Sequence, residues 1–247
     1  MGKLKRQLQF NTSYDEVPST LKDKPFYGLN LDEYQENFRD AIWSPETIAV
    51  FCDAKAGTGK TTIALGTANL LVQYGLYDGI VYIVFPTNEM KQGYLPGTQE
   101  EKTAPYIQPL IDACIACGLE PSIVIKSDDN IQAQKEGRSY IEYMAETYMR
   151  GINLEHKVII LDEASNAYGD VLRKVLTRIH DNSKAIIIGS HVQCDLLKHS
   201  ERSGFVPYIN AFREANDPRV KVCELKKNYR GWFSTFCDEV VFEWERK

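Results

Sequence analysis

Short, almost wholly apolar runs alternate with longer amphipathic segments over most of the chain. Such runs are typical of strands that are buried on both faces, whereas apolar positions three and four residues apart are typical of helices. Strands joined in turn by helices form a parallel sheet with helices on both faces, so the pattern predicts an α/β fold. The strands are expected at 47–52, 80–85, 157–162, 185–189 and 219–225, and the helices at 30–43, 60–75, 109–118, 169–180 and 231–244.

The beginning of the chain lacks this alternation. Residues 1–28 are polar and irregular, and we expect them to be an arm or lead-in to a single domain that spans 29–247. Asn30 and Glu33 have the spacing of a capping box at the start of the first helix. The polar stretch 126–139 is expected to be an exposed loop or insertion.

Composition narrows the class of protein. The chain is 43% hydrophobic and 26% charged, as in ordinary globular proteins, and its net charge of −5 argues against a protein that coats nucleic acid over its whole surface. It has neither a membrane-spanning apolar run nor a signal peptide, so a soluble, cytoplasmic protein is expected. Cys114 and Cys117 have the spacing of a redox or half-zinc pair, but reduced cysteines on a helix face are the favoured interpretation.

The stretch VFCDAKAGTGKTTIALG, residues 50–66, joins the first predicted strand to the helix that follows it. In a phosphate-binding loop, glycines turn backbone N–H groups toward the phosphates, a lysine neutralises their oxygens and a hydroxyl binds Mg²⁺. Gly57 and Gly59 would form this turn, with Lys60 as the charge and Thr61 as the metal ligand. An ordinary strand-to-helix turn is the weaker alternative in this context. The expected nucleotide-binding loop also includes Ala56, Thr58 and Thr62.

Two acidic residues stand at the end of the predicted strand 157–162. Asp162 is placed to hold Mg²⁺, and Glu163 to orient or deprotonate an attacking water, unless the two only cap a helix. A residue that activates water favours hydrolysis over a small-molecule kinase, which has to exclude water. Gln193, just beyond the strand 185–189, is expected to sense the γ-phosphate, the alternative being an ordinary loop residue.

Three further side chains are candidates for contacts with the nucleotide or a partner. The amide of Gln35 matches the N6 donor and N7 acceptor of adenine and would select ATP over GTP, unless it lies exposed on its helix. Arg230 in LKKNYRG would supply positive charge at the γ-phosphate, unless it is a surface arginine. Arg178 is a second candidate to act in a neighbouring subunit, and together with Arg173 and Lys174 it could meet a phosphate backbone or only water.

These motifs resemble those of PhoH-like ATPases. AGTGKT, GYLPGTQEEKTAPYIQPLIDA, YMRG, VIILDEASN, LTRIHDNSKAIIIGSHVQCDL and SGF occur in that family's order between residues 30 and 215. The resemblance implies a RecA-like P-loop fold related to superfamily 1 helicase motor domains, with ATP and Mg²⁺ as cofactors. It also implies RNA-related functions and a ring-shaped homo-oligomer such as a hexamer.

The favoured function is therefore an ATPase that couples hydrolysis to RNA or single-stranded DNA. A nucleotide-switched binding module with little turnover and a P-loop small-molecule kinase are the alternatives. The loop with Lys91, Tyr94 and Lys102 combines positive charge with an aromatic ring, as loops that bind single strands do. Glu100 and Glu101 weaken the positive electrostatic potential of this loop.

Four positions depart from or modify the resemblance. Ala54 replaces the glycine that begins the strict P-loop motif, and Phe85 replaces an arginine before a proline. Ser190 stands where the family has an aspartate before the sensor glutamine, which removes a contact to Mg²⁺ or water. The Asn-Tyr-Arg sequence that ends at Arg230 is similar to a superfamily 1 helicase motif and strengthens Arg230 as a phosphate contact.

Overall fold

Six strands form one sheet in the order β3-β2-β4-β5-β1-β6, and each strand is parallel to its neighbours. The structure is a computed structural model that describes residues 17–85, 106–149, 152, 154–194, 196, 202–238 and 240. The expected parallel α/β architecture is confirmed, and it is of the RecA-like kind. The strands are β1 (Ala49–Ala54), β2 (Ile80–Val84), β3 (Ile141–Ala145), β4 (Val158–Asp162), β5 (Lys184–Gly189) and β6 (Val220–Leu225).

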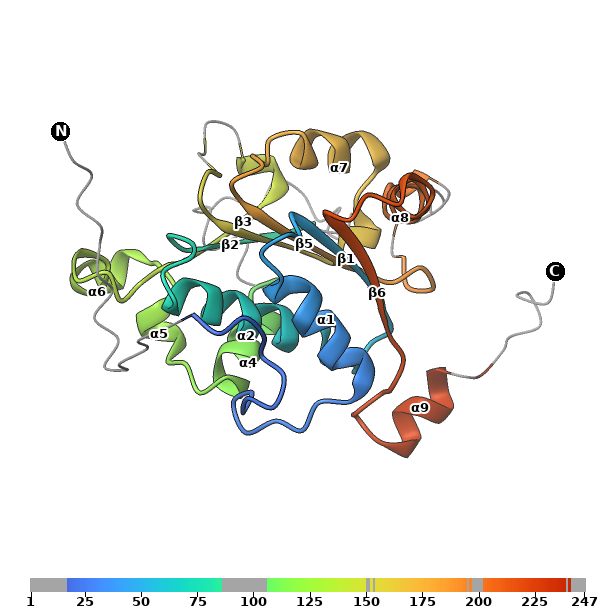
Figure 1. The fold of residues 1–247 in the computed structure, drawn as a ribbon, viewed down its shortest axis with the longest axis horizontal. Coiled ribbons are helices and arrows are strands. Elements are labelled where there is room, and N and C mark those ends of the chain that lie inside the picture. The colour runs from blue at the N-terminus through green and yellow to red at the C-terminus, as the bar shows by residue number, and fades with distance from the viewer. Residues whose placement is uncertain are drawn as a thin grey trace, which may run out of the picture.

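Helices cover both faces of the sheet (Figure 1). The core accordingly divides into two apolar clusters, because successive strand residues point to opposite faces: Val50 and Cys52 belong to one cluster and Phe51 to the other. One face carries α1 (Glu33–Trp43), α2 (Lys60–Gln73), α4 (Gln108–Ala116) and α5 (Pro121–Val124), and the other carries α7 (Gly169–Leu176) and α8 (Phe205–Ala215). The remaining elements are η2 (Asp128–Asn130), α6 (Ile131–Lys135), η3 (Glu146–Tyr148), η4 (Ala164–Asn166) and α9 (Trp232–Asp238).

The strand order decides where the candidate site forms. β5 lies between β1 and β4, and it pairs with both. All three strands run in the same direction, so the loops that follow them meet at the carboxyl edge of the sheet. These loops carry the predicted phosphate-binding residues, the acidic pair and Gln193.

Several predicted elements differ from the observed ones. The capping box of α1 is formed by Asp32 and Gln35 rather than by Asn30 and Glu33, because the helix begins only at residue 33. The stretch 126–139, expected to be a loop, contains η2 and α6. The helix expected over 169–180 ends at Leu176, and only α9 is described from the helix expected over 231–244. The strand β3 and the helix α8 were not predicted at all.

The described end of the expected lead-in packs against α2. Leu21 and Phe26 are 4% and 3% exposed, and the Tyr27 hydroxyl donates to the carbonyl oxygen of Gly66 at 3.0 Å. A Cβ atom on Gly66 would lie only 2.7 Å from the Phe26 ring. A glycine at this position of α2 therefore lets residues 17–28 approach the helix closely.

The cysteines behave as buried or surface thiols without disulfides. All six are free, and each lies in the described part of the chain. Burial raises the pKa of both Cys114 and Cys117 to about 12, so both metal-free thiols are protonated at neutral pH. The interpretation as reduced cysteines on the face of α4 is supported. No helix within the described ranges has the length and apolar character to cross a membrane.

Lys184 is a buried cation at the start of β5. It is 1% exposed, and its Nζ donates to the carbonyl oxygen of Ser44 at 2.6 Å. Burial lowers the pKa of Lys184 from 10.5 to about 8, so between these pH values the unfolded chain binds more protons than the folded one. Stability therefore rises with pH across this window, and below it the buried charge destabilises the fold.

Replacing Lys184 by Met should raise the free energy of unfolding at about pH 7 by about 1–3 kcal/mol, because the desolvated charge is removed. The gain should shrink as the pH rises from about 8 toward 10.5, where wild-type Lys184 becomes neutral in both states. Urea unfolding of both proteins at about pH 7 and pH 9.5 measures this. A less stable Met variant at neutral pH would show that the hydrogen bond to Ser44 outweighs desolvation.

Candidate active site

The loop between β1 and α2 has the conformation of a phosphate cradle. Gly57 and Gly59 have φ angles of +73° and +78°, which a glycine adopts without strain. Gly59 is the N-cap of α2, and no side-chain cap from the described residues occupies the first-turn N–H groups of this helix. Such N–H groups bind anions. The buried Thr58 fixes the loop by donating from Oγ1 to the Lys55 carbonyl oxygen at 3.0 Å, and the predicted contacts of Ala56 and Thr62 with nucleotide stay predictions.

Asp162 ends β4 with its side chain buried beside the start of α2. Its Oδ2 accepts hydrogen bonds from Thr61 Oγ1 at 2.8 Å and from the Tyr82 hydroxyl at 2.6 Å. Burial and the adjacent Asp162 carboxylate raise the pKa of Tyr82 well above its ordinary value, so this phenol remains a donor. The predicted metal-binding pair is thus brought together. Its hard oxygen donors suit Mg²⁺, which takes few protein ligands and completes its shell with phosphate and water.

Glu163 turns away from the strand toward the phosphate-binding loop. Its Oε1 lies 2.9 Å from Lys60 Nζ, and its side chain is 45% exposed while that of Lys60 is 11% exposed. Glu163 has a φ of +53°, a left-handed conformation that costs a non-glycine residue about 1 kcal/mol. Its own N–H donates to Asp162 Oδ1 at 2.9 Å and holds this turn. The candidate base and the candidate phosphate-binding cation therefore form an ion pair.

The loop after β5 is held by a carboxylate from β1. Asp53 accepts a hydrogen bond from the His191 N–H at 3.0 Å and lies 2.7 Å from His191 Nδ1. Gln193 is exposed in the same loop, and its N–H donates to Ser190 Oγ at 3.3 Å. Ser190 removes one carboxylate from the expected pattern, but Asp53 supplies another at the neighbouring strand end. Phe85, the other departure, is buried in the apolar core.

Gln35 lies against the phosphate-binding loop and is 6% exposed, so it is not an exposed helix residue. Its Nε2 donates to the Thr58 carbonyl oxygen at 2.9 Å, and its Oε1 accepts from the Asp32 N–H at 3.1 Å. The amide therefore supports the loop in this structure. Its predicted contact with adenine stays a prediction.

The segment that follows β6 crosses the phosphate-binding loop of the same chain. The Tyr229 N–H donates to the Gly57 carbonyl oxygen at 2.8 Å, and its hydroxyl donates to Asp32 Oδ2 at 2.8 Å. A Cβ atom on Gly57 would lie 2.5 Å from Asn228 Oδ1 and 3.0 Å from Arg230 Cγ. Arg230 therefore lies beside its own loop, and Gly57 is a glycine partly to make room for this segment.

Two other predicted partner-binding groups lie elsewhere. Arg178 follows α7, on the face of the sheet opposite α2, and its Nη1 donates to the Met149 carbonyl oxygen at 3.0 Å. The loop with Lys91, Tyr94 and Lys102 lies outside the described residues.

Sequence reasoning missed Tyr82, Asp53 and Tyr229. Tyr82 looks like an ordinary core residue of an apolar strand, and Asp53 like the start of the loop. Tyr229 stands in the LKKNYRG motif, but its contact to Gly57 depends on β6 lying beside β1. No local pattern signals any of these contacts.

Comparisons with known proteins agree with this geometry. The family described as "PhoH-like protein" matches residues 30–231. The chain is 35% identical over 177 residues to "Protein PhoH2" of Bacillus subtilis (strain 168), covering 70% of this chain and 39% of that protein. It is 30% identical over 181 residues to "Protein PhoH" of Escherichia coli (strain K12), covering 68% of this chain and 45% of that protein.

A solved structure supports the fold alone. The large terminase of bacteriophage HK97 matches 80% of this chain and 39% of its own with a TM-score of 0.50, at 15% sequence identity.

Fold and site together define a P-loop protein of the ATPase-like class, in which nucleotide binding is expected. The chain belongs to the PhoH-like family, and the resemblance found in its motifs is confirmed. It spans less than half the length of the two relatives named above.

Proposed function

We propose that this protein is a Mg²⁺-dependent ATPase that couples hydrolysis to single-stranded nucleic acid, RNA or DNA. Hydrolysis is supported by the contact between Lys60 and Glu163, which lies beside the hydrogen-bonded pair of Thr61 and the buried Asp162. A cation for the phosphates, a metal-binding pair and a carboxylate for the water then share one strand edge, as phosphoryl transfer to water requires.

Each group has a role in the proposed reaction. Lys60 and the loop N–H groups bind the phosphates, and Thr61 and Asp162 would hold the Mg²⁺, which offsets charge on the phosphate oxygens. Glu163 accepts a proton from the attacking water. Arg230 stabilises the charge that develops on the phosphates, and Gln193 responds to the loss of the γ-phosphate.

In the proposed mechanism, the ion pair between Lys60 and Glu163 keeps Glu163 from acting as a base while no nucleotide is bound. When phosphate oxygens arrive, they compete with Glu163 for the Lys60 ammonium, because both are anionic. The half-exposed Glu163 is then released toward the water, so that the base becomes available only once nucleotide is bound.

A nucleotide-switched binding module is the second candidate, and Ser190 favours it. With a hydroxyl where the resembled family has a carboxylate, a contact to Mg²⁺ or water is lost, which would slow turnover. A small-molecule kinase fits less well, since Glu163 offers water a base.

Phosphate release measured with and without oligouridine or oligothymidine separates these functions. The proposed function predicts turnover that chelation of Mg²⁺ stops and that a single-stranded oligonucleotide stimulates. If neither oligonucleotide changes the rate of turnover, the coupling to nucleic acid is rejected and the ATPase activity is retained. ATP binding without turnover would support the switch module, and turnover that appears only with a small-molecule acceptor would support the kinase.

We also propose that the protein forms a homo-oligomer, such as a ring, through α9. Trp232, Phe233 and Phe236 are 76%, 72% and 55% exposed, and the rings of Trp232 and Phe236 stack with centroids 5.6 Å apart. Exposed aromatic clusters of this kind mark interaction surfaces. The helix begins two residues after Arg230, so a subunit bound there would lie next to the ATP site.

Replacing Trp232 and Phe236 together by Glu should lower the molar mass measured by light scattering, because two charges would enter the interface. The matched control is Ile115→Glu on α4, which changes an isolated apolar residue that is 61% exposed and should leave the mass unchanged. A wild-type protein that is already monomeric, with and without ATP, would reject the oligomer.

A further inference from the structure

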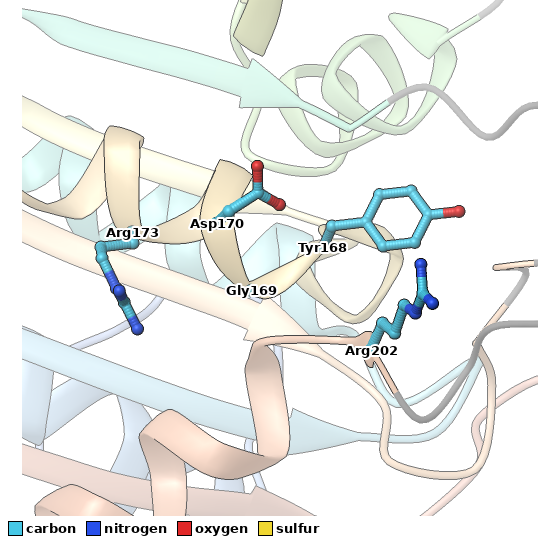
Figure 2. Close-up of a pocket in the computed structure, with 5 residues that line it drawn as sticks. All are labelled: Tyr168, Gly169, Asp170, Arg173 and Arg202. Atoms are coloured by element: carbon cyan, nitrogen blue, oxygen red, sulfur yellow. The ribbon is translucent and has the colours of Figure 1, made fainter.

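A pocket of about 510 Å³ opens at the start of α7, on the face of the sheet opposite α2 (Figure 2). This size is within the range of natural ligand pockets. Figure 2 shows the side chain of Arg202 pointing toward the ring of Tyr168, with Arg173 farther along α7. The lining residues are Tyr168, Gly169, Asp170, Arg173 and Arg202.

Direct backbone packing builds this pocket. The Gly204 N–H donates to the Ala167 carbonyl oxygen at 3.0 Å, and a Cβ atom on Gly204 would lie only 2.8 Å from Gly169 Cα. Tyr168 and Ser203 form an antiparallel bridge. The residues on either side of the opening, Tyr168 and Arg202, therefore stand on two segments that are fixed against each other.

The lining combines an aromatic ring with two cations. Tyr168 is half-buried, so one part of its ring is open to the pocket, and both arginines are exposed. The Asp170 carboxylate also lies here, but Lys174 Nζ is 3.3 Å from it and offsets its charge. An aromatic ring and flanking cations are the two features with which proteins hold single-stranded nucleic acid, since bases stack and phosphates pair.

We propose that this pocket binds a single-stranded polynucleotide, with a base stacked on Tyr168 and backbone phosphates bound by Arg173 and Arg202. The inference rests on the proposed coupling to nucleic acid, and it identifies the surface at which the nucleic acid would bind. An acidic peptide would use the two arginines but would gain little from the ring. A duplex keeps its bases stacked on each other and could not offer one to Tyr168.

Hydrogen bonds connect the pocket to the ATP site. The carbonyl oxygen of Ser165 accepts from Ser203 Oγ at 2.7 Å and from Cys194 Sγ at 3.2 Å. Ser165 lies two residues after Glu163, and Cys194 follows Gln193 directly. One carbonyl oxygen thus links the loop of the candidate base, the loop of the candidate γ-phosphate sensor and the segment next to Arg202.

This link supplies a route for coupling. A base stacked on Tyr168 would restrain the four residues, 164–167, that lie between Tyr168 and Glu163. Nucleic acid would then stimulate hydrolysis by holding Glu163 in its working position, without touching ATP.

The test is fluorescence anisotropy with labelled oligouridine and oligothymidine, in the presence of a non-hydrolysable ATP analogue. Tyr168→Leu should weaken binding about tenfold by removing the stacking ring, whereas Tyr168→Phe should keep wild-type affinity. Arg173→Gln and Arg202→Gln should each weaken binding and reduce the slope of log affinity against log salt by about 0.7. Arg138→Gln, which removes an exposed arginine beside α6, is the control and should change neither value.

The outcomes separate the pocket from the proposed function. If Tyr168→Leu and both arginine variants bind oligonucleotide as tightly as the wild type and melt at the same temperature, the pocket is not the binding site. The proposed coupling to nucleic acid would then still stand. Equal loss in Tyr168→Phe and Tyr168→Leu would overturn the stacking contact. Polyglutamate that competes as well as oligouridine would show a general anion site. Absence of oligonucleotide binding by the wild type would overturn the pocket and the coupling together, whereas ATP turnover is judged separately.

Discussion

Replacing Glu163 by Gln should lower the rate of ATP hydrolysis by about 10²–10⁴-fold while nucleotide binding is retained, because an amide cannot take the proton of the attacking water. The affinity for ATP should stay the same or increase. In the wild type, Lys60 has to leave a contact of 2.9 Å with Glu163 to reach the phosphates, and the variant has no anion there. Single-turnover phosphate release and the Kd of a fluorescent ATP analogue measure the two effects.

Glu214→Gln is the matched control, since Glu214 is exposed on α8, on the face of the sheet opposite α2. It should hydrolyse ATP at the wild-type rate. A Glu163→Gln protein with wild-type turnover would show that Glu163 is not the base. A variant that no longer binds ATP would show that Glu163 supports the phosphate-binding loop and not the chemistry.

The sequence pattern predicts the interior of this fold better than its edges. β1, β4 and β5 lie between other strands and are covered on both faces, so their sequences are almost wholly apolar. β3 is an edge strand, and it carries Glu142, which pairs with Lys126 and Lys157. An edge strand leaves some side chains partly in solvent, so it can contain a charged residue such as Glu142. In so short a run, that residue breaks the apolar pattern by which the other strands are predicted.

The helix α8 was missed for a local reason. Its first turn contains Pro207, which reads as a helix breaker, but a proline near the start of a helix removes no intrahelical hydrogen bond. The shifted capping box has a different, non-local cause. Asn30, Asp32 and Glu33 offer overlapping spacings, and the choice between them depends on the packing of Gln35 on the loop at Thr58.

In the candidate site, too, some residues could be predicted from the sequence and others could not. The phosphate-binding loop is a contiguous motif whose function follows from its own glycines, so its residues could be named from the sequence. Other contacts in the site come from distant parts of the chain: Tyr82 reaches Asp162 through β2, and Asn228 and Tyr229 reach the loop through β6. Their positions follow from the order of the strands, which the sequence pattern does not determine.

Strand order also bears on whether Arg230 would act at the proposed ATP site of its own chain or at that of a neighbour. β6 pairs with β1, so the chain leaves β6 at the same edge at which the phosphate-binding loop begins. The Tyr229 N–H donates to the Gly57 carbonyl oxygen, and a Cβ atom on Gly57 would lie only 3.0 Å from Arg230 Cγ. This geometry favours action within one chain.

Arg230→Ala should therefore lower the rate of ATP hydrolysis by about 10³-fold or more, as the loss of an arginine that stabilises the transferred phosphoryl group does. Arg138→Ala removes an exposed arginine far along the chain and should have no effect. Steady-state phosphate release measures both variants.

A mixed assembly decides which subunit supplies the arginine. Arg230→Ala and Glu163→Gln chains can be co-expressed with different tags and purified through both tags, so that each assembly contains both variants. If Arg230 acts within its own chain, every site lacks either the base or the arginine, and the mixture should be inactive. If it acts across an interface, sites that combine an intact Glu163 with a neighbour's intact Arg230 should restore part of the activity. Restored activity would contradict the contact at Gly57 as the working position and would make oligomerisation a requirement for hydrolysis.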